Sequence, residues 1–396
     1  MNATLLVLTV GTGTAGPTSD LVTGLRRTIE LLAPRLYWLL PSVSSDSIAT
    51  ADLVREGMPG FQRWNADCLY RLIVQHDSFE HCREAVREVL AAARGKLKSG
   101  EKLLLNPTSG TKQMSAGATL AALDMGVGEI VFTVGERADG VVKTGTERIE
   151  RFDASTYHAE RDGRLAAELA ASGSYRAAAR ILERHECFRE RADLAACLSA
   201  WSNQDYERAR TVAARSSNPA LFEVRSVLTE LAAATKPGAP PSELVAADLL
   251  QNANILLGQG AAASALFLAC KSLEIGLRAR LYKTTGLMEP YRISALGALP
   301  LSEELMRRAV AGGRGETCIL NLQSVAKILE SLNDPLAEAL LEHSRLPALV
   351  NVRNQMAHGI RTVSKKEARE MIDCTTTLLS SHGALVEVAP RPPLPV

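Results

Sequence analysis

Short apolar segments alternate with longer periodic ones over the first 153 residues, and this alternation then stops. We predict strands at 4–10, 36–40, 69–75, 102–105 and 129–134, and helices at 19–33, 46–58, 79–97 and 111–125. Residues 140–152 supply one or two closing strands. Strands that alternate with helices form a parallel sheet with helices on its faces. We therefore expect an α/β Rossmann-like N-terminal domain.

The rest of the chain is rich in alanine and has helical periodicity. Tyr175 and Tyr206 begin two similar segments 31 residues apart, close to the period of a tetratricopeptide helix pair. The proline-rich segment 236–241 interrupts any helix and is predicted to be a linker. The expected parts are the α/β domain at 1–153, a helical spacer with the linker at 154–241, an all-α domain at 242–386 and a disordered tail at 387–396.

Composition narrows the class of protein. A chain of 396 residues with 46% hydrophobic content is long enough for several cores. The net charge of +1 gives no overall attraction to nucleic acid, so contact with RNA would need a local basic patch. The seven cysteines are scattered, which indicates reduced thiols in the cytoplasm and no structural metal. No apolar stretch approaches the roughly 18 residues of a membrane span.

The first predicted strand ends in a glycine turn, Gly11 to Gly16, that fits the GxGxxG pattern of dinucleotide-binding enzymes. Two features disfavour that alternative. Pro17 follows the third glycine at once, and the second strand ends without an acidic residue to bind a ribose hydroxyl. A glycine turn at a strand end still lets a ligand approach the backbone closely, so Thr12 and Gly13 are candidate ligand-binding residues.

A second loop, Asn106 to Lys112, joins the strand at 102–105 to the next helix. A lysine in the first turn of a helix is disfavoured by the helix dipole unless an anion lies nearby. Backbone N–H groups at such a turn converge on a phosphate. We therefore expect a phosphate-containing ligand to bind there; the alternative is a solvated lysine. The candidate residues are Asn106, Ser109, Gly110, Thr111 and Lys112.

Near the C-terminus, Arg353 precedes His358 by five residues. The same spacing occurs in 71–76 and 180–185, so spacing alone carries little information. The segment at 353–358 differs in its neighbours, which include Asn354 and the basic residues Arg345, Arg361, Lys365, Lys366 and Arg369. Five residues of α-helix turn through about 140°, so the arginine and the histidine cannot share one face. We expect a composite site built from two copies of the chain.

These segments together resemble the type III CRISPR-associated ribonucleases that join an N-terminal CARF domain to a C-terminal HEPN domain. The turn at 10–13 is similar to the first-strand motif of CARF domains, and residues 109–114 are similar to their Gly-Thr-Lys-x-Met motif. Residues 353–358 resemble the R-N-x-x-A-H form of the HEPN signature. The helical segments from 248 to 274 resemble the early HEPN helices, with Glu274 as a candidate supporting residue.

The resemblance implies a homodimeric, metal-independent endoribonuclease of CRISPR antiviral defence, activated allosterically by a cyclic oligoadenylate. We favour cyclic tetra-adenylate over the hexa-adenylate. Single-stranded RNA would be cut by its own 2′-hydroxyl, leaving a cyclic phosphate and a 5′-hydroxyl. His358 would transfer protons and Arg353 would bind the phosphate. Asn354 would orient the phosphate or the histidine. The alternative is a nucleotide-sensing regulatory protein whose HEPN domain is catalytically inactive and binds a partner.

Overall fold

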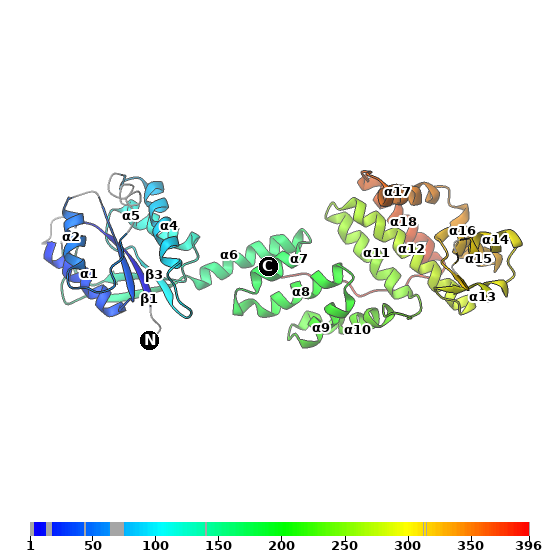
Figure 1. The fold of residues 1–396 in the computed structure, drawn as a ribbon, viewed down its shortest axis with the longest axis horizontal. Helices are drawn as coiled ribbons and strands as arrows, with labels where there is room; N and C mark the ends of the chain where they lie inside the picture. The colour runs from blue at the N-terminus through cyan, green and yellow to red at the C-terminus, as the bar shows by residue number, and fades with distance from the viewer. Residues whose placement is uncertain are drawn as a thin grey trace. The chain divides into compact units, whose positions relative to one another are not determined.

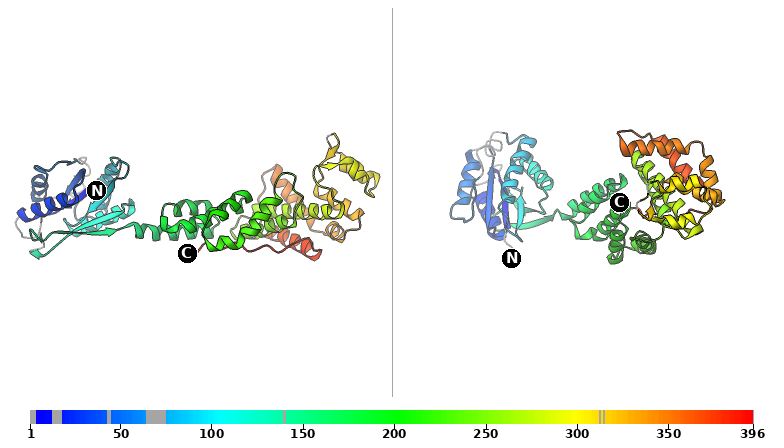
Figure 2. Two further views of the ribbon diagram at one scale, coloured as in Figure 1. Left: turned by 90° about the horizontal axis from the view of Figure 1, so that it is seen from below. Right: turned by 45° about the vertical axis from the view of Figure 1, so that its right-hand side comes forward.

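A computed structural model describes residues 4–12, 18–42, 45–63, 75–138, 141–311, 313 and 315–395. The chain divides into two compact units, one up to residue 161 and the other from residue 162 onward. The first unit holds the large sheet, and the second is built of helices (Figures 1 and 2). Across the described residues, none of the helices has the length and apolar character needed to cross a bilayer.

The first unit contains a five-stranded sheet with strand order β2-β1-β3-β4-β7. The strands are β1 (Thr4–Val10), β2 (Leu36–Pro41), β3 (Lys102–Asn106), β4 (Glu129–Val134) and β7 (Arg148–Asp153). The first four are parallel, and β7 runs antiparallel to β4. The predicted α/β fold is thus confirmed. The strand predicted at 69–75 lies almost entirely outside the described residues.

Helices cover both faces of this sheet (Figure 1). Side chains of alternate residues in β1 enter opposite cores, which is the period of an extended strand. The helices on one face are α1 (Thr18–Leu32) and α2 (Ser45–Arg55), and those on the other are α4 (Phe79–Arg94) and α5 (Lys112–Asp124). A sheet buried on both sides explains why its central strands are almost wholly apolar.

The strand order creates a switch point beside β1. The chain passes from β1 to its neighbour β2, and later enters β3 on the other side of β1. The connections after β1 and β3 therefore diverge to opposite sides of the sheet. In open parallel sheets, the carboxyl ends of two such strands form the crevice in which ligands bind.

The second unit is helical apart from one short pair of strands, β8 (Tyr291–Arg292) and β9 (Thr317–Cys318). Its helices up to the linker are α7 (Tyr175–Leu182), α8 (Arg189–Ser202), α9 (Tyr206–Arg215) and α10 (Pro219–Ala234), preceded by α6 (Ser155–Ala171). After the linker come α11 (Glu243–Gly258), α12 (Ala262–Thr285), α13 (Ile293–Gly297), α14 (Glu303–Val310), α15 (Leu322–Ser331), α16 (Pro335–Glu342), α17 (Leu346–His358) and α18 (Lys365–Ser381).

The spacer and the C-terminal helices share one hydrophobic core, which extends from Leu194 to Ala384. A buried carboxylate strengthens this connection, because Asp248 of α11 accepts hydrogen bonds from Trp201 at 2.7 Å and Tyr206 at 2.9 Å. The boundary proposed at residue 241 therefore separates two segments of sequence that pack around a common core.

The C-terminal tail was expected to be disordered. Its described residues form neither helix nor strand, yet Arg391 is buried, with a side chain that is 4% exposed. Its guanidinium donates to Ser202 at 2.9 Å and to Asn252 at 3.0 Å, and it pairs with Asp248 at 3.5 Å. These contacts hold the tail against the helices of the second unit.

Candidate functional sites

A cavity of about 510 Å³ lies at the switch point of the sheet, and we refer to it as the strand-end cavity. Connections after β1, β3 and β4 form much of its wall, and α1 closes one side. Its lining residues are Gly11, Thr12, Asp20, Leu21, Gly24, Leu25, Ser42, Thr108, Ser109, Gly110, Thr111, Lys112, Thr133, Arg137 and Val142. A cavity of this size and polarity can hold a small polar ligand.

Two glycines bring the β1 and β3 connections into contact. A Cβ atom added at Gly11 would lie 2.6 Å from the backbone nitrogen of Gly110, so only glycine fits there. The N–H of Gly11 donates to the Ser109 hydroxyl at 2.9 Å. Gly110 has a φ of +121°, which favours glycine as well. The two connections thus meet through backbone atoms at the wall of the cavity.

The predicted ligand-binding residues fall into different roles. Lys112 is exposed and lines the cavity, together with Thr12, Ser109 and Gly110. Thr111 also lines it, but its hydroxyl caps α5 by accepting from the Met114 N–H at 3.2 Å, and it donates to the His76 carbonyl at 2.9 Å. Gly13 lies outside the described residues.

Asn106 differs from expectation because it does not line the cavity. It is 2% exposed, and its amide donates to the Thr133 hydroxyl at 2.9 Å. The side-chain oxygen of Asn106 accepts a hydrogen bond from the backbone N–H of Thr108 at 2.9 Å, which closes an Asx turn. Asn106 therefore stabilises the shape of the loop, because its side chain is hydrogen-bonded to Thr108 and Thr133 within the protein.

Sequence analysis missed two charged residues of this cavity. Arg137 belongs to β5 (Arg137–Ala138), which follows β4, and Asp20 lies in the first turn of α1. The Asp20 carboxylate accepts from the Thr144 hydroxyl at 2.9 Å. Arg137 and Lys112 give the cavity two cations, one from the segment after β4 and one from the start of α5. The only signal for Arg137 was its place after the carboxyl end of a predicted strand.

A second cavity, of about 460 Å³, lies in the helical unit, and we refer to it as the α17 cavity. Helices α12, α16, α17 and α18 and the start of α15 enclose it. Its lining residues are Cys270, Leu273, Glu274, Asn321, Leu322, Gln323, Leu340, Leu341, Leu346, Pro347, Val350, Asn351, Arg353, Asn354 and Met371. Two of the three predicted catalytic residues, Arg353 and Asn354, are among them.

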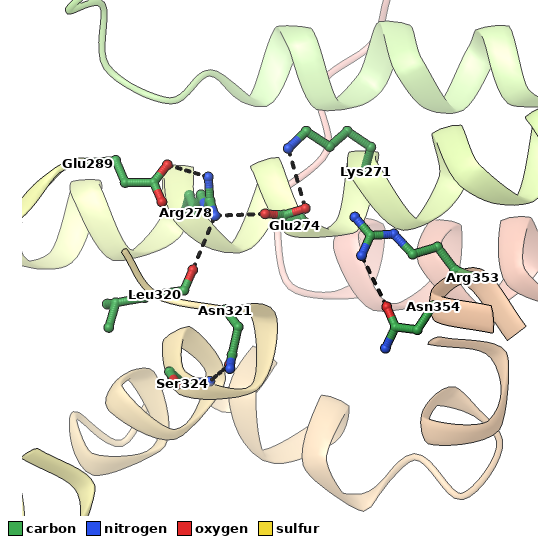
Figure 3. Close-up of polar contacts among 9 residues, drawn as sticks. All are labelled: Lys271, Glu274, Arg278, Glu289, Leu320, Asn321, Ser324, Arg353 and Asn354. Carbon is green, nitrogen blue, oxygen red and sulfur yellow. Dashed lines mark hydrogen bonds and ion pairs between the residues drawn. The ribbon is translucent and has the colours of Figure 1, made fainter. Parts of the chain in front are cut away.

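The Arg353 guanidinium contacts neutral groups in the structure. It donates to the Asn354 side-chain oxygen at 3.1 Å (Figure 3), and it lies over the Phe267 ring at 5.5 Å from the centroid. Neither contact neutralises its charge. Arg353 is therefore held by an amide and an aromatic ring in a position where it can bind an anion.

Glu274 is part of a chain of ion pairs beside Arg353 (Figure 3). Its carboxylate binds Arg278 at 2.7 Å and Lys271 at 3.4 Å. Arg278 also pairs with Glu289 at 2.5 Å and donates to the Leu320 carbonyl at 3.2 Å. Arg278 thereby joins α12 to the start of α15. Glu274 was predicted as a supporting residue, and the structure places it in the wall of the same cavity.

His358 is the last residue of α17 and is exposed. It does not line the α17 cavity, whereas Arg353 does. His358 lies four residues beyond Asn354, the last residue of α17 that lines the cavity, and is therefore about 6 Å further along the helix. Within one chain, the three predicted catalytic side chains do not all reach one cavity.

The second arginine–histidine pair has a structural role. The His185 ring binds the Asp162 carboxylate at 2.9 Å, with side-chain exposures of 16% and 8%. The pair at 71–76 cannot be compared, because Arg71 lies outside the described residues. Thiol chemistry is disfavoured at the α17 cavity, since burial raises the pKa of Cys270 to about 12. Among the described residues, no group of three or more acidic, histidine or cysteine side chains could hold a metal ion.

No protein-family model matches this chain, and no curated protein matches it in sequence. A search of solved structures matches Csm6 from Enterococcus italicus, bound to cyclic hexa-2′-fluoro-hexa-dAMP. The TM-score is 0.57 at 13% sequence identity, and the match covers 98% of this chain and 96% of that one. The chain has the fold of Csm6.

Csm6 is a type III CRISPR protein of the CARF–HEPN type, so the resemblance drawn from sequence motifs is confirmed at the level of the fold. The coverage of the match includes both the sheet-containing unit and the helical unit. At 13% identity, only a few motif residues could have carried the resemblance in the sequence.

Proposed function

We propose that the protein is an endoribonuclease switched on by a cyclic oligoadenylate that binds in the strand-end cavity. The observation that carries this proposal is the cavity itself. It lies at the switch point of the sheet, two glycine-containing connections expose their backbone there, and Lys112 and Arg137 supply positive charge. The Csm6 structure with the same fold contains a cyclic adenylate analogue, which supports the choice of ligand class.

The reaction proposed for the α17 site uses no metal. Arg353 binds the scissile phosphate of single-stranded RNA through its guanidinium, and Asn354 orients that phosphate or the histidine. His358 moves the proton from the 2′-hydroxyl that attacks the phosphorus, because imidazole titrates near neutral pH. The 5′-oxygen leaves, and the products carry a cyclic phosphate and a 5′-hydroxyl.

A homodimer explains how the separated residues could meet. Two copies of α17 related by a two-fold axis bring Arg353 from both chains and His358 from both chains to one cleft. A ring with an even number of adenylates can lie on the same axis and contact both strand-end cavities. Ligand binding then favours the dimer geometry that assembles the cleft, which is allosteric activation by a population shift.

We favour cyclic tetra-adenylate as the activator, whereas the Csm6 structure holds a six-membered ring. In a cell with a type III CRISPR system, either activator would place the protein in antiviral defence in the cytoplasm.

The test is cleavage of a fluorescent single-stranded RNA in EDTA, with no activator, with cyclic tetra-adenylate and with cyclic hexa-adenylate. We expect cleavage to require one of the two rings and to persist in EDTA. The products should be a 2′,3′-cyclic phosphate and a 5′-hydroxyl, identified by mass spectrometry. An absence of cleavage with both rings would contradict the proposal.

A second candidate is a regulator that senses a nucleotide and has no nuclease activity. The observation that favours it is the position of His358, which is exposed and outside the α17 cavity. The two candidates differ in one result. The regulator would bind a cyclic adenylate in calorimetry and leave the RNA intact at every protein concentration.

A further inference from the structure

We propose that the α17 cavity binds one base of the RNA substrate, next to the scissile phosphate, and that this base is guanine. This inference rests on the proposed nuclease function and adds a specificity site to it. The residues that carry it are Glu274, Asn321 and Asn351, none of which belongs to the proposed catalytic set.

A stripe of polar side chains runs along α17. Asn351, Asn354 and His358 are separated by three and then four residues, so they lie along one face of the helix. Seven residues of α-helix extend over about 10 Å, which is the scale of one nucleotide. If the phosphate binds at Asn354 and His358, the adjoining base reaches Asn351 and the interior of the cavity.

The wall of the α17 cavity combines apolar surface with polar groups. Leu273, Leu346, Val350 and Met371 supply apolar surface on several sides. The polar groups are four side-chain amides, the Glu274 carboxylate, the Cys270 thiol and the Arg353 guanidinium, which is the group assigned to the phosphate. A nucleobase has apolar faces and a polar edge, so this combination suits a base better than a phosphate or a sugar.

The hydrogen-bonding capacity of Glu274 favours guanine over the other bases. The Glu274 carboxylate offers two oxygens, and each has capacity for about two hydrogen bonds. One oxygen binds Arg278 and the other binds Lys271, so each can accept one more bond. Guanine presents two adjacent N–H donors on its Watson–Crick edge. Adenine, cytosine and uracil each place an acceptor beside the donor, which would face a carboxylate oxygen unfavourably.

Asn321 completes this pattern. Its side-chain oxygen accepts the Ser324 N–H at 2.8 Å and caps α15 (Figure 3), while its amide nitrogen donates to none of the described residues. That nitrogen can donate to the guanine O6, which lies next to the two N–H donors on the same edge. Arg278 positions both partners, because it binds Glu274 directly and holds the Leu320 carbonyl next to Asn321.

The test maps cleavage positions in a pool of single-stranded RNAs of random sequence, with the protein activated by its cyclic adenylate. We expect wild-type cleavage to favour guanine at one fixed position beside the cut by about tenfold or more. Glu274→Gln replaces an acceptor by an amide, and the guanine preference among the RNAs that are cut should fall below about threefold, whatever the change in overall rate. The control Glu338→Gln makes the same change on α16 at an exposed residue outside the cavity, and should keep the wild-type preference.

A second variant keeps the test informative if Glu274→Gln unfolds, which thermal melting would reveal. Leu322→Trp fills the cavity from the start of α15, and it should also remove the guanine preference. A wild-type pattern with no base preference, or one that both variants leave intact, would overturn the inference. A preference for another base would overturn the role of Glu274 in selecting guanine.

Binding of guanosine 5′-monophosphate separates failure of this inference from failure of the proposed function. Saturation-transfer NMR should detect binding to the wild-type protein and a loss of at least fivefold in signal for Leu322→Trp. Binding without RNA cleavage would retain the base site and reject the nuclease. Cleavage with neither base preference nor nucleotide binding would retain the nuclease and reject the base site.

Discussion

The strand-end cavity and the α17 cavity differ in how much of each site one chain supplies. In the first, backbone groups and side chains from several connections converge at one edge of the sheet. In the second, Arg353 and Asn354 line the wall, while His358 lies outside it at the end of the helix. One chain therefore contains a formed ligand cavity and an incomplete set of proposed catalytic residues.

This difference follows from the geometry of the two folds. A parallel sheet gathers the carboxyl ends of its strands at one edge, so residues far apart in the sequence meet there without a partner. A single helix separates residues five positions apart by about 140°, and no packing within the chain removes that offset. A second copy does. One chain thus forms the whole strand-end cavity, whereas cleavage is proposed as a property of a dimer.

The largest expected effect is the loss of cleavage on removal of either of two proposed catalytic side chains, Arg353 and His358. Arg353→Ala removes the phosphate contact and His358→Ala removes the proton carrier, and each should lower the cleavage rate by about 10³-fold or more. Activator affinity, measured by calorimetry, should stay unchanged. Near wild-type cleavage by the His358 variant would contradict the assignment.

The control for this experiment is Arg189→Ala, which removes an arginine that is 78% exposed on α8. His185 is unsuitable as a control. Its replacement would remove the contact with the buried Asp162 carboxylate and cost about 1–3 kcal/mol of stability. A loss of activity in that variant would report unfolding, not chemistry.

Mixing the two inactive variants tests whether the proposed cleft is shared. If all four side chains of the dimer act on one phosphate, a heterodimer of Arg353→Ala and His358→Ala chains has no complete set, and we expect no recovery of cleavage. If an arginine and a histidine from opposite chains work as a pair, one of the two half-sites remains whole and activity returns in part. Full activity from a verified monomer would contradict both arrangements.

A smaller but still large effect is expected at the contact between the two glycine-containing connections. In Gly11→Ala, the new Cβ would meet the Gly110 nitrogen at 2.6 Å and its Cα at 2.7 Å, and neither backbone atom can rotate away. The loops must separate, and activator affinity should fall by about 100-fold, or roughly 2.7 kcal/mol. The control Gly128→Ala adds a methyl group with no neighbour within 4 Å. Equal affinities in the two variants would show that this contact does not shape the ligand site.

Adjacent residues at the start of α5 should respond differently. Lys112→Ala removes a cation from the cavity wall and should weaken activator binding by about tenfold, with little change in stability. Thr111→Ala removes the cap of α5 and the bond to the His76 carbonyl, and should cost about 1 kcal/mol of unfolding free energy. Calorimetry and thermal melting separate the two effects. Unchanged affinity in the lysine variant would contradict its role in binding.

The sequence predicted the sheet well because its strands are buried on both faces. The bounds of β1 and β4 agree with the predicted ranges, since continuous apolar runs bounded by turns leave little choice of register. The expectation of a disordered tail rested on its prolines. A buried arginine that pairs with Asp248 cannot be seen in local composition, because its partners lie more than 130 residues away.

The candidate sites were predicted only where local sequence positions a residue. Lys112 follows a strand end, so topology alone directs it toward the cavity. Asn106 and Thr111 have the same local context, yet their polar groups are bonded within the protein, and sequence does not show which donors are already used. Arg137 contributes from another connection and belongs to no motif.

The smallest effect on activity is expected for the buried pair Asp248 and Arg391. Changing this pair also tests whether the two sites are energetically separate. Asp248 is fully buried, and the hydrogen bonds that its carboxylate accepts from Trp201 and Tyr206 come from neutral donors. Arg391→Gln leaves this carboxylate without a counter-charge and should lower the unfolding free energy by about 3 kcal/mol. Asp248→Asn should cost a similar amount, because it leaves the guanidinium unpaired over the Trp201 ring.

The double variant distinguishes charge from packing. Arg391→Gln combined with Asp248→Asn contains no buried charge, so its loss of stability in urea unfolding should be smaller than the sum of the two single losses by at least about 1 kcal/mol. The control Arg308→Gln breaks an exposed pair with Glu304 and should change stability by less than about 1 kcal/mol. Additive losses in the double variant would show that the tail contributes packing alone. Since the pair lines neither cavity, activator affinity should stay at the wild-type value in every folded variant, and a reduced affinity would show that the helical unit influences the strand-end cavity.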